Sequence, residues 1–222
     1  MRLFYRFRVE GREHIPATGG VILFANHQSF LDPIVIGLIE NRRHFRSLAR
    51  TGLFKSRMLA WLIDALGAIP IEQGTGDLGA MRAAIGAVKQ GKVVVIFPEG
   101  GRSHSGTTEP FQRGIMLLIK KTKAPIVPIA IEGAFDVWPT GRRFPRLSGR
   151  VRVRAAPAIS HDELTAVPPD SLLESLRHQI ESMRMQLRDD IRKDSRGRYP
   201  VEQLGVKPYW EALPSAADDS SA

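Results

Sequence analysis

The chain has 222 residues, which suits one domain with a sizeable hydrophobic core and a short tail. The absence of cysteine excludes disulfide bonds, thiolate metal sites and a cysteine nucleophile. The formal net charge of +9 favours anionic partners, namely nucleic acid, phosphorylated substrates or an anionic membrane leaflet.

The first half of the chain alternates short apolar runs with segments of helical spacing. The run Val21–Ala25 predicts a buried strand, and Asp32-Pro33 resembles a helix start with a capping aspartate and a proline in the first turn. In chain order, we expect a helix to about residue 39, a strand at 46–49, a helix at 53–66, a strand at 68–71, a helix at 77–90 ended by Gly91, and a strand at 93–97.

The second half continues the alternation and ends in a polar tail. We expect a loop at 98–108, a helix at 115–122, strands at 126–131 and 150–154, and an amphipathic helix at about 171–192. Strands alternating with helices predict a single α/β domain over residues 1–196, with a mostly parallel sheet flanked by helices. Residues 197–222 predict a polar, partly disordered tail.

No stretch reaches the roughly 18 apolar residues of a spanning helix, and Met1–Glu10 lacks the apolar block of a secretory signal. The expected helix at 53–66, with Trp61 near Lys55 and Arg57, suits an interfacial helix or, alternatively, a core helix. A later basic stretch suits lipid head groups, nucleic acid or one half-exposed face of an edge strand. Its members are Arg142, Arg143, Arg146, Arg150, Arg152 and Arg154.

Two polar loops follow buried strands, at the sheet edge where α/β proteins place active sites. The first loop holds His27 and, five residues on, Asp32. A carboxylate beside one imidazole nitrogen fixes the tautomer and leaves the other nitrogen as a general base. Spacing alone leaves open that His27 is an ordinary loop residue and Asp32 only a helix cap. The chain has neither cysteine nor a Gly-x-Ser-x-Gly elbow. The simplest interpretation is therefore that His27 activates a hydroxyl of the substrate itself.

The second loop, residues 97–103, has two glycines that allow backbone N–H groups to approach an anion. Arg102 offers a fork of donors suited to phosphate, and Ser103 adds a hydroxyl. A tight turn with a solvated arginine is the alternative. Five further basic residues are candidates to line the same groove, with solvated surface charge as the alternative: Arg42, Arg43, Arg46, Arg50 and Lys55. No histidine spacing suits a metal site.

Four segments together resemble the ordered motifs of the glycerolipid acyltransferase family, and the resemblance covers about residues 9–158. They are Asn-His-Gln-Ser-Phe-Leu-Asp at 26–32, Gly-Ala-Ile-Pro-Ile at 67–71, Phe-Pro-Glu-Gly-Gly-Arg-Ser at 97–103 and Val-Pro-Ile at 127–129, the last followed by Glu132-Gly133.

The resemblance implies an α/β fold and transfer of an acyl group from acyl-CoA or acyl carrier protein, with His27 as base and Asp32 as its orienting partner. It associates Glu99, Gly100 and Arg102 with the phosphate of the acceptor. Arg50 stands near a position where relatives often have lysine. The substrate-binding residues expected on this basis are Arg50, Gln73, Glu99, Gly100, Gly101, Arg102 and Ser103. No cofactor or metal is expected, because the acyl thioester is a substrate.

Three departures from the family pattern bear on the acceptor and on membrane attachment. Gln73 stands where relatives often have a phosphate-binding arginine, Gly101 stands where they usually have threonine, and we expect no helices ahead of the domain. We expect an O-acyltransferase acting on a lysophospholipid, most specifically 1-acylglycerol 3-phosphate. The expected location is cytoplasmic, peripheral on the inner face of an anionic membrane.

Three alternatives to this expectation stay open. The same chemistry on another lysolipid or on an aminoacyl lipid is favoured by Gln73. A nucleic-acid-binding module explains the charge but not the His27 loop, and stacking aromatics are few, so no nucleic acid is expected as partner. A catalytically silent membrane scaffold leaves the histidine–aspartate pair unexplained.

Overall fold

The computed structural model describes residues 4–50, 69–71 and 78–200. The helix expected at 53–66 and the position of Gln73 lie outside these ranges. Within them, the strands form one sheet in the order β1-β7-β6-β2-β5-β3-β4. Neighbouring strands run parallel except β6 and β7, which are antiparallel. The expected α/β class with a mostly parallel sheet is confirmed.

The elements follow the predicted order and add four that the sequence patterns did not indicate: β1, the short 3-10 helix η1, α5 and α6. The bounds are β1 Phe4–Glu10, η1 Arg12–His14, β2 Val21–Ala25, α1 Asp32–Ile39, β3 Phe45–Arg50, β4 Ile69–Ile71, α3 Leu78–Lys89, β5 Val93–Ile96, α4 Ile115–Thr122, β6 Ile126–Glu132, α5 Ala134–Val137, β7 Ser148–Ala155, α6 His161–Thr165 and α7 Pro169–Ser195.

The central strand β2 is buried on both faces, which is why it reads as a continuous apolar run. Val21 and Leu23 point into one core cluster, and Ile22 and Phe24 point into the other. Helices α1 and α5 cover the first cluster, whereas α3, α4, α6 and α7 cover the second. The sheet is therefore the middle of three layers.

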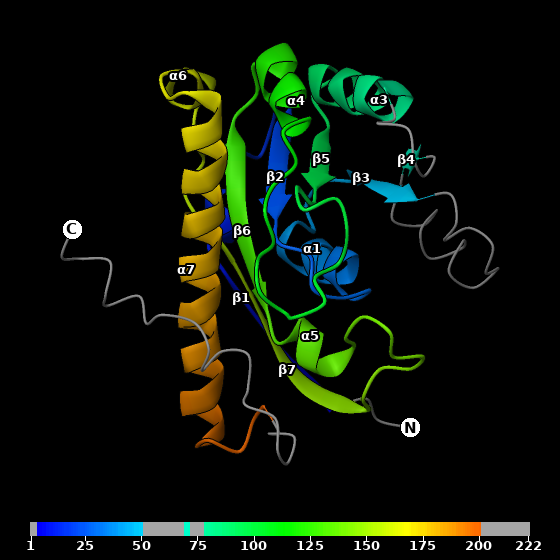
Figure 1. Cartoon of the computed structure of the whole chain (residues 1–222), viewed down its shortest axis with the longest axis vertical. Coiled ribbons are helices and arrows are strands. Elements are labelled where there is room, and N and C mark those ends of the chain that lie inside the picture. The colour runs from blue at the N-terminus through cyan, green and yellow to red at the C-terminus, as the bar shows by residue number, and fades with distance from the viewer. Residues whose placement is uncertain (1–3, 51–68, 72–77, 201–222) are drawn as a thin grey trace.

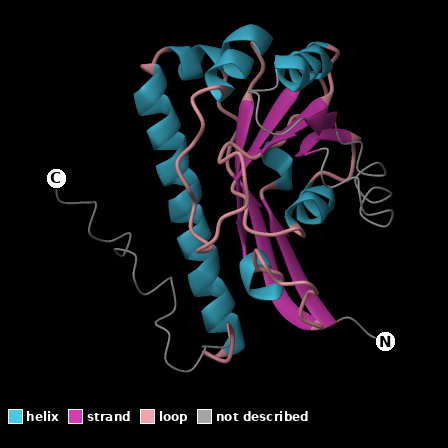
Figure 2. Cartoon of the chain, turned by 45° about the vertical axis from the view of Figure 1, so that its right-hand side comes forward, coloured by secondary structure: helices cyan, strands magenta, loops and turns pink. Residues whose placement is uncertain are grey.

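Helix α7 runs along the sheet beside β6 and β7 (Figures 1 and 2). It confirms the amphipathic helix expected at about 171–192 and is longer by a few residues at each end. Its apolar stripe includes the fully buried Ile180 and Leu187. Among the residues that the structure describes, no helix has both the length and the apolar character needed to cross a bilayer.

The alternative that the basic residues of β7 lie on an edge strand is wrong. The strand lies between β1 and β6, so it is not an edge. The side chain of Arg152 is only 7% exposed and pairs with Glu10 of β1 and with Asp190 of α7. Arg154 pairs with the same two acids. These arginines therefore join β7 to its neighbours.

Candidate active site

The two polar loops identified from the sequence meet at one end of the sheet. Strands β2 and β5 are parallel neighbours, so the loops that follow their carboxyl ends lie side by side. Two hydrogen bonds join the loops: His27 N donates to Oε1 of Glu99 over 2.7 Å, and Ser103 N donates to the carbonyl of His27 over 2.7 Å. The histidine is thus held at both its N–H and its C=O.

Asp32 is fully buried and is directed back at the loop that precedes it. Its Oδ2 accepts from His27 Nδ1 at 2.7 Å, from Gln28 N at 2.6 Å and from Ser29 N at 2.7 Å. The expectation that Asp32 caps its helix is wrong, since Leu31 occupies the N-cap position and makes no side-chain capping bond. The carboxylate instead fixes the histidine loop.

The contact with Asp32 determines which nitrogen of His27 carries a proton. A carboxylate only accepts hydrogen bonds, so Nδ1 of a neutral imidazole holds the hydrogen and Nε2 keeps its lone pair. The ring of Phe97 stacks on the imidazole, with centroids 4.1 Å apart and planes inclined by 19°. The His27 side chain is 19% exposed and that of Asp32 is 0% exposed. This is the geometry of an oriented general base.

Glu99 of the second loop is buried against the first loop and is only 7% exposed. One carboxyl oxygen accepts from His27 N, and the other accepts from Glu109 N at 3.1 Å. Burial raises the pKa of Glu99 to about 8; the two backbone N–H donors oppose this shift, and the charges of Asp32 and Glu109 add to it. Both oxygens therefore contact the protein's own backbone, and the phosphate role implied by the resemblance stays a prediction.

The glycine-rich turn places Arg102 beside the first loop. Gly100 has φ +74°, a conformation that favours glycine, and its N–H closes the turn onto the Phe97 carbonyl at 3.1 Å. The guanidinium carbon of Arg102 lies 3.6 Å from the ring centroid of Phe30, and Arg102 is partly exposed. Gly101 is also partly exposed.

The hydroxyl of Ser103 has neighbours within its own loop. Ser103 is 1% exposed, and its Oγ accepts from Gly106 N at 2.9 Å. It also lies within 3.3 Å of Oε1 of Glu109. These contacts make Ser103 a loop-forming residue, and contact with a ligand stays a prediction.

The remaining predicted residues divide into two groups. Arg50 ends β3, where its backbone is paired with Ile71, while its side chain and Gln73 lie outside the described residues. Arg42 and Arg43 bond to the carbonyls of Ile15 and Pro16 at 2.9 and 3.0 Å. Those two arginines therefore fasten the segment before β2.

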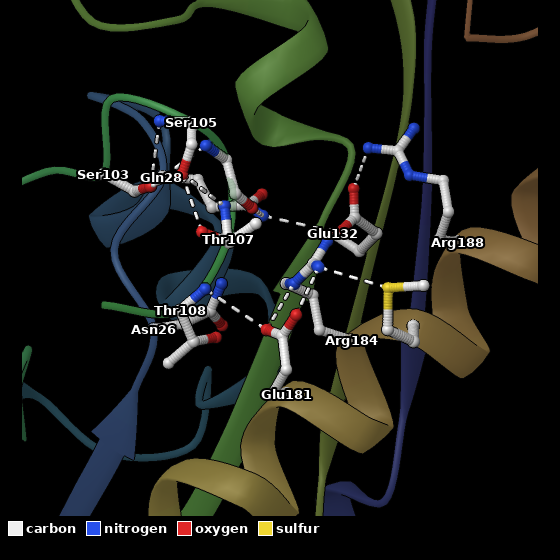
Figure 3. A network of polar contacts seen from close by, with 12 residues as sticks. Asn26, Gln28, Ser103, Ser105, Thr107, Thr108, Glu132, Glu181, Arg184 and Arg188 are labelled. Atoms are coloured by element: carbon white, nitrogen blue, oxygen red, sulfur yellow. Dashed lines mark hydrogen bonds and ion pairs between the residues drawn. The ribbon is translucent and has the colours of Figure 1, made fainter. Parts of the chain in front are cut away.

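Figure 3 shows a network of buried polar contacts next to the histidine loop. The sequence patterns did not indicate this network. Gln28 Nε2 donates to the carbonyl of Gly106 at 2.6 Å and lies 3.4 Å from Oε2 of Glu132, at the end of β6. Glu132 in turn bonds to Arg184 and Arg188 of α7, and all three side chains are 0% exposed. The available signal was helical spacing, because both arginines fall within the apolar stripe of α7.

The sequence indicated the arginines of the loop after α5, residues 138–147, but not that this loop borders the site. The ring of Trp138 packs against Phe30, with centroids 5.2 Å apart. Ser29 Oγ donates to the carbonyl of Trp138 at 2.8 Å, and Thr140 Oγ1 donates to the carbonyl of Ser103 at 3.0 Å. The loop is thus tied to both halves of the site.

Comparison with known proteins identifies what this arrangement is similar to. A sequence model of the acyltransferase family matches residues 6–132. A chloroplastic 1-acyl-sn-glycerol-3-phosphate acyltransferase of Brassica napus is 30% identical over 186 residues, which are 82% of this chain and 52% of the relative. The alpha form from Mus musculus is 31% identical over 184 residues, 79% of this chain and 62% of the relative.

The structural comparison agrees with the sequence comparisons. The crystal structure of the 1-acyl-sn-glycerophosphate acyltransferase PlsC of Thermotoga maritima matches with a TM-score of 0.72 at 26% identity, covering 84% of this chain and 73% of that one. The chain spans about half the length of the plant relatives it matches.

Proposed function

Because this chain belongs to the acyltransferase family, we propose that it is an O-acyltransferase that moves a fatty acyl group from a thioester to the hydroxyl of a lysophospholipid. The donor is acyl-CoA or acyl carrier protein. The acceptor we favour is 1-acylglycerol 3-phosphate, the substrate in the names of the plant and mouse relatives, and the product is then phosphatidic acid. The observation that carries the proposal is the oriented His27–Asp32 pair beside the 97–103 loop.

In the proposed reaction the acceptor hydroxyl donates a hydrogen bond to Nε2 of His27. As the imidazole takes that proton, the oxygen attacks the thioester carbonyl and forms a tetrahedral intermediate. The C–S bond then breaks, and the imidazolium returns the proton as the thiol leaves. Asp32 stabilises the imidazolium by a charge-assisted hydrogen bond. No acyl-enzyme forms.

We propose that the acceptor binds with its phosphate at Arg102. Arg102, whose guanidinium lies on the ring of Phe30, is the proposed phosphate ligand. Gln73 supports the nearest rival, a lysolipid with a different head group, since an amide lacks the charge that relatives often place there. The proposal includes peripheral attachment to the inner, cytoplasmic face of a membrane, because the acceptor is a membrane lipid.

A thioester-consumption assay tests the proposal. Free thiol is measured with acyl-CoA or acyl carrier protein as donor and with 1-acylglycerol 3-phosphate, neutral or zwitterionic lysolipids and glycerol 3-phosphate as acceptors. We expect the largest kcat/KM for 1-acylglycerol 3-phosphate, and a loss of at least about two orders of magnitude in kcat for His27→Ala.

Three results would contradict parts of this account. Preference for another lysolipid would favour the Gln73 rival. A folded His27→Ala variant with near wild-type turnover would remove the histidine from the mechanism. A trapped acyl-enzyme, detected by intact-protein mass spectrometry, would exclude direct transfer.

A further inference from the structure

The loop of residues 138–147 projects from the sheet between α5 and β7, at the lower right of Figure 1. It carries the two most exposed large apolar side chains of the described residues, Phe144 at 67% and Leu147 at 63% exposure. A single exposed apolar residue needs no explanation, but a pair on one short projecting loop marks a surface that can be covered by a partner.

The same loop is strongly basic. It contains Arg142, Arg143 and Arg146 and no acidic residue. Arg142 and Arg143 are exposed, and the guanidinium carbon of Arg143 lies 5.3 Å from the ring centroid of Phe144. Cationic and apolar side chains thus share one surface, the combination with which peripheral proteins bind anionic lipid interfaces.

The base of the loop is fixed beside the active site. The indole N–H of Trp138 donates to the carbonyl of Arg142 at 2.9 Å. The ring of Trp138 packs on Phe30, and the guanidinium of Arg102 lies over the ring of Phe30. Thr140 is bonded to the carbonyl of Ser103. The loop that carries the exposed side chains is therefore anchored at its base next to the proposed phosphate ligand.

We propose that residues 142–147 dock on an anionic phospholipid bilayer, with Phe144 and Leu147 entering the interface and the arginines contacting lipid phosphates. The proposal rests on the proposed function, which makes the acceptor a bilayer lipid. A bilayer explains charge and apolar exposure together, whereas an anionic polymer needs only the arginines. Because the base of the loop is bonded to Ser103 and packed on Phe30, docking holds the site close to the bilayer that contains the acceptor.

Sedimentation of the full chain with vesicles tests the docking surface. Phosphatidylglycerol–phosphatidylcholine vesicles and pure phosphatidylcholine vesicles are compared, at low and physiological salt. Relative to wild type, we expect Phe144→Ser/Leu147→Ser and Arg142→Gln/Arg143→Gln each to reduce partitioning onto the anionic vesicles by about tenfold or more. The matched control, Leu117→Ser/Val167→Ser, removes exposed apolar side chains elsewhere, at 39% and 40% exposure, and leaves partitioning unchanged.

Activity separates docking from catalysis. With a short-chain 1-acylglycerol 3-phosphate dissolved below its critical micelle concentration, both loop variants keep kcat/KM within about twofold of wild type. With a long-chain acceptor embedded in vesicles, their activity falls in parallel with binding. Thermal unfolding followed by circular dichroism confirms that the variants are folded.

The outcomes distinguish the docking proposal from the proposed function. Wild-type vesicle binding by both loop variants overturns the docking surface, whatever the activity. Binding of single-stranded DNA that depends on the arginines, with no vesicle binding by wild type, also overturns it. Loop-dependent vesicle binding without acyl transfer to any lysolipid sustains the docking and overturns the proposed function.

Discussion

Two arginine-rich regions of this molecule have similar composition and opposite surroundings. In β7 and α7, the side chains of Arg152 and Arg184 are 7% and 0% exposed and are paired with acids. In the 138–147 loop, Arg142 and Arg143 are exposed, and no acid accompanies them within the loop. Residues 142–154 form one basic stretch in the sequence, so local sequence does not explain why some of these arginines are buried and paired and others are exposed. Their neighbours in space explain it.

The comparison shows how the net charge of +9 should be interpreted. A guanidinium paired in the interior already has its counter-charge and contributes little to the binding of an external anion. An exposed guanidinium on a projecting loop retains its field at the surface. Of these two regions, the exposed loop is therefore the one that the docking proposal assigns to an anionic partner.

Removal of a buried arginine gives the largest expected effect on stability. Arg184→Met leaves Glu132 buried with one of its two arginine partners missing, so we expect a loss of about 3–5 kcal/mol in the free energy of unfolding. Urea denaturation measures it, with Arg142→Met as the exposed control. A loss below about 1 kcal/mol would show that the buried and exposed arginines do not differ in this way.

A second buried acid, Glu99, sharpens the comparison because backbone N–H groups bind it in place of the guanidinium pair that binds Glu132. Its pKa is about 8 in the fold, against an ordinary value of 4.5, so folding takes up a proton between these pH values. Stability from this residue is therefore present at pH 4.5 and is lost as the pH rises toward about 8.

Comparison with Glu99→Gln isolates this effect from other titrating groups. The free energy of unfolding of the variant, relative to that of wild type, should rise by about 2–4 kcal/mol between pH 5 and pH 8.5. Urea denaturation at the two pH values measures the difference. If wild type instead becomes more stable relative to the variant as the pH rises, the two N–H donors outweigh burial in setting the pKa of Glu99.

The arginine of β7 should give an intermediate effect. The partners of Arg152 are partly exposed, with Glu10 at 35% and Asp190 at 34%, so water can solvate them when the guanidinium is removed. We expect Arg152→Met to cost about 1–2 kcal/mol, measured by urea denaturation. A cost equal to that of Arg184→Met would mean that exposure of the acids does not matter.

The smallest effect on stability is expected in the loop. Arg142→Gln/Arg143→Gln should change the free energy of unfolding by less than about 0.5 kcal/mol, since both side chains are exposed. Urea denaturation in low and physiological salt measures it. A larger loss would assign these arginines a structural role and weaken the contrast with β7.

The sequence predicted those parts of the fold that local patterns determine. Strands β2 and β5, and β6 up to Ile131, are continuous apolar runs because both their faces are buried. The contact between His27 and Asp32 was likewise predictable, because both belong to one short loop and helix start. The role of His27 as a base stays a prediction.

Long-range partners explain what the sequence did not predict. Strand β1 alternates arginines with aromatic residues over four positions, and its place beside β7 depends on a segment more than a hundred residues away. Arg184 and Arg188 fall within the apolar stripe of α7, and only the position of Glu132 explains why two charged side chains are buried there. The arginines of the 138–147 loop are visible in the sequence, but the place of this loop beside the site depends on the packing of Trp138 against Phe30.

The pairing of β1 with β7 has a consequence for synthesis of the chain. Phe4 is aligned with Ser148, so β1 emerges from the ribosome long before β7, its neighbour among the described strands. At about 5–20 residues per second the interval is roughly 7–30 s. During that time β1 is an unpaired strand in a crowded cell, and Arg6 and Arg8 are the kind of charged side chains that discourage pairing with other nascent chains.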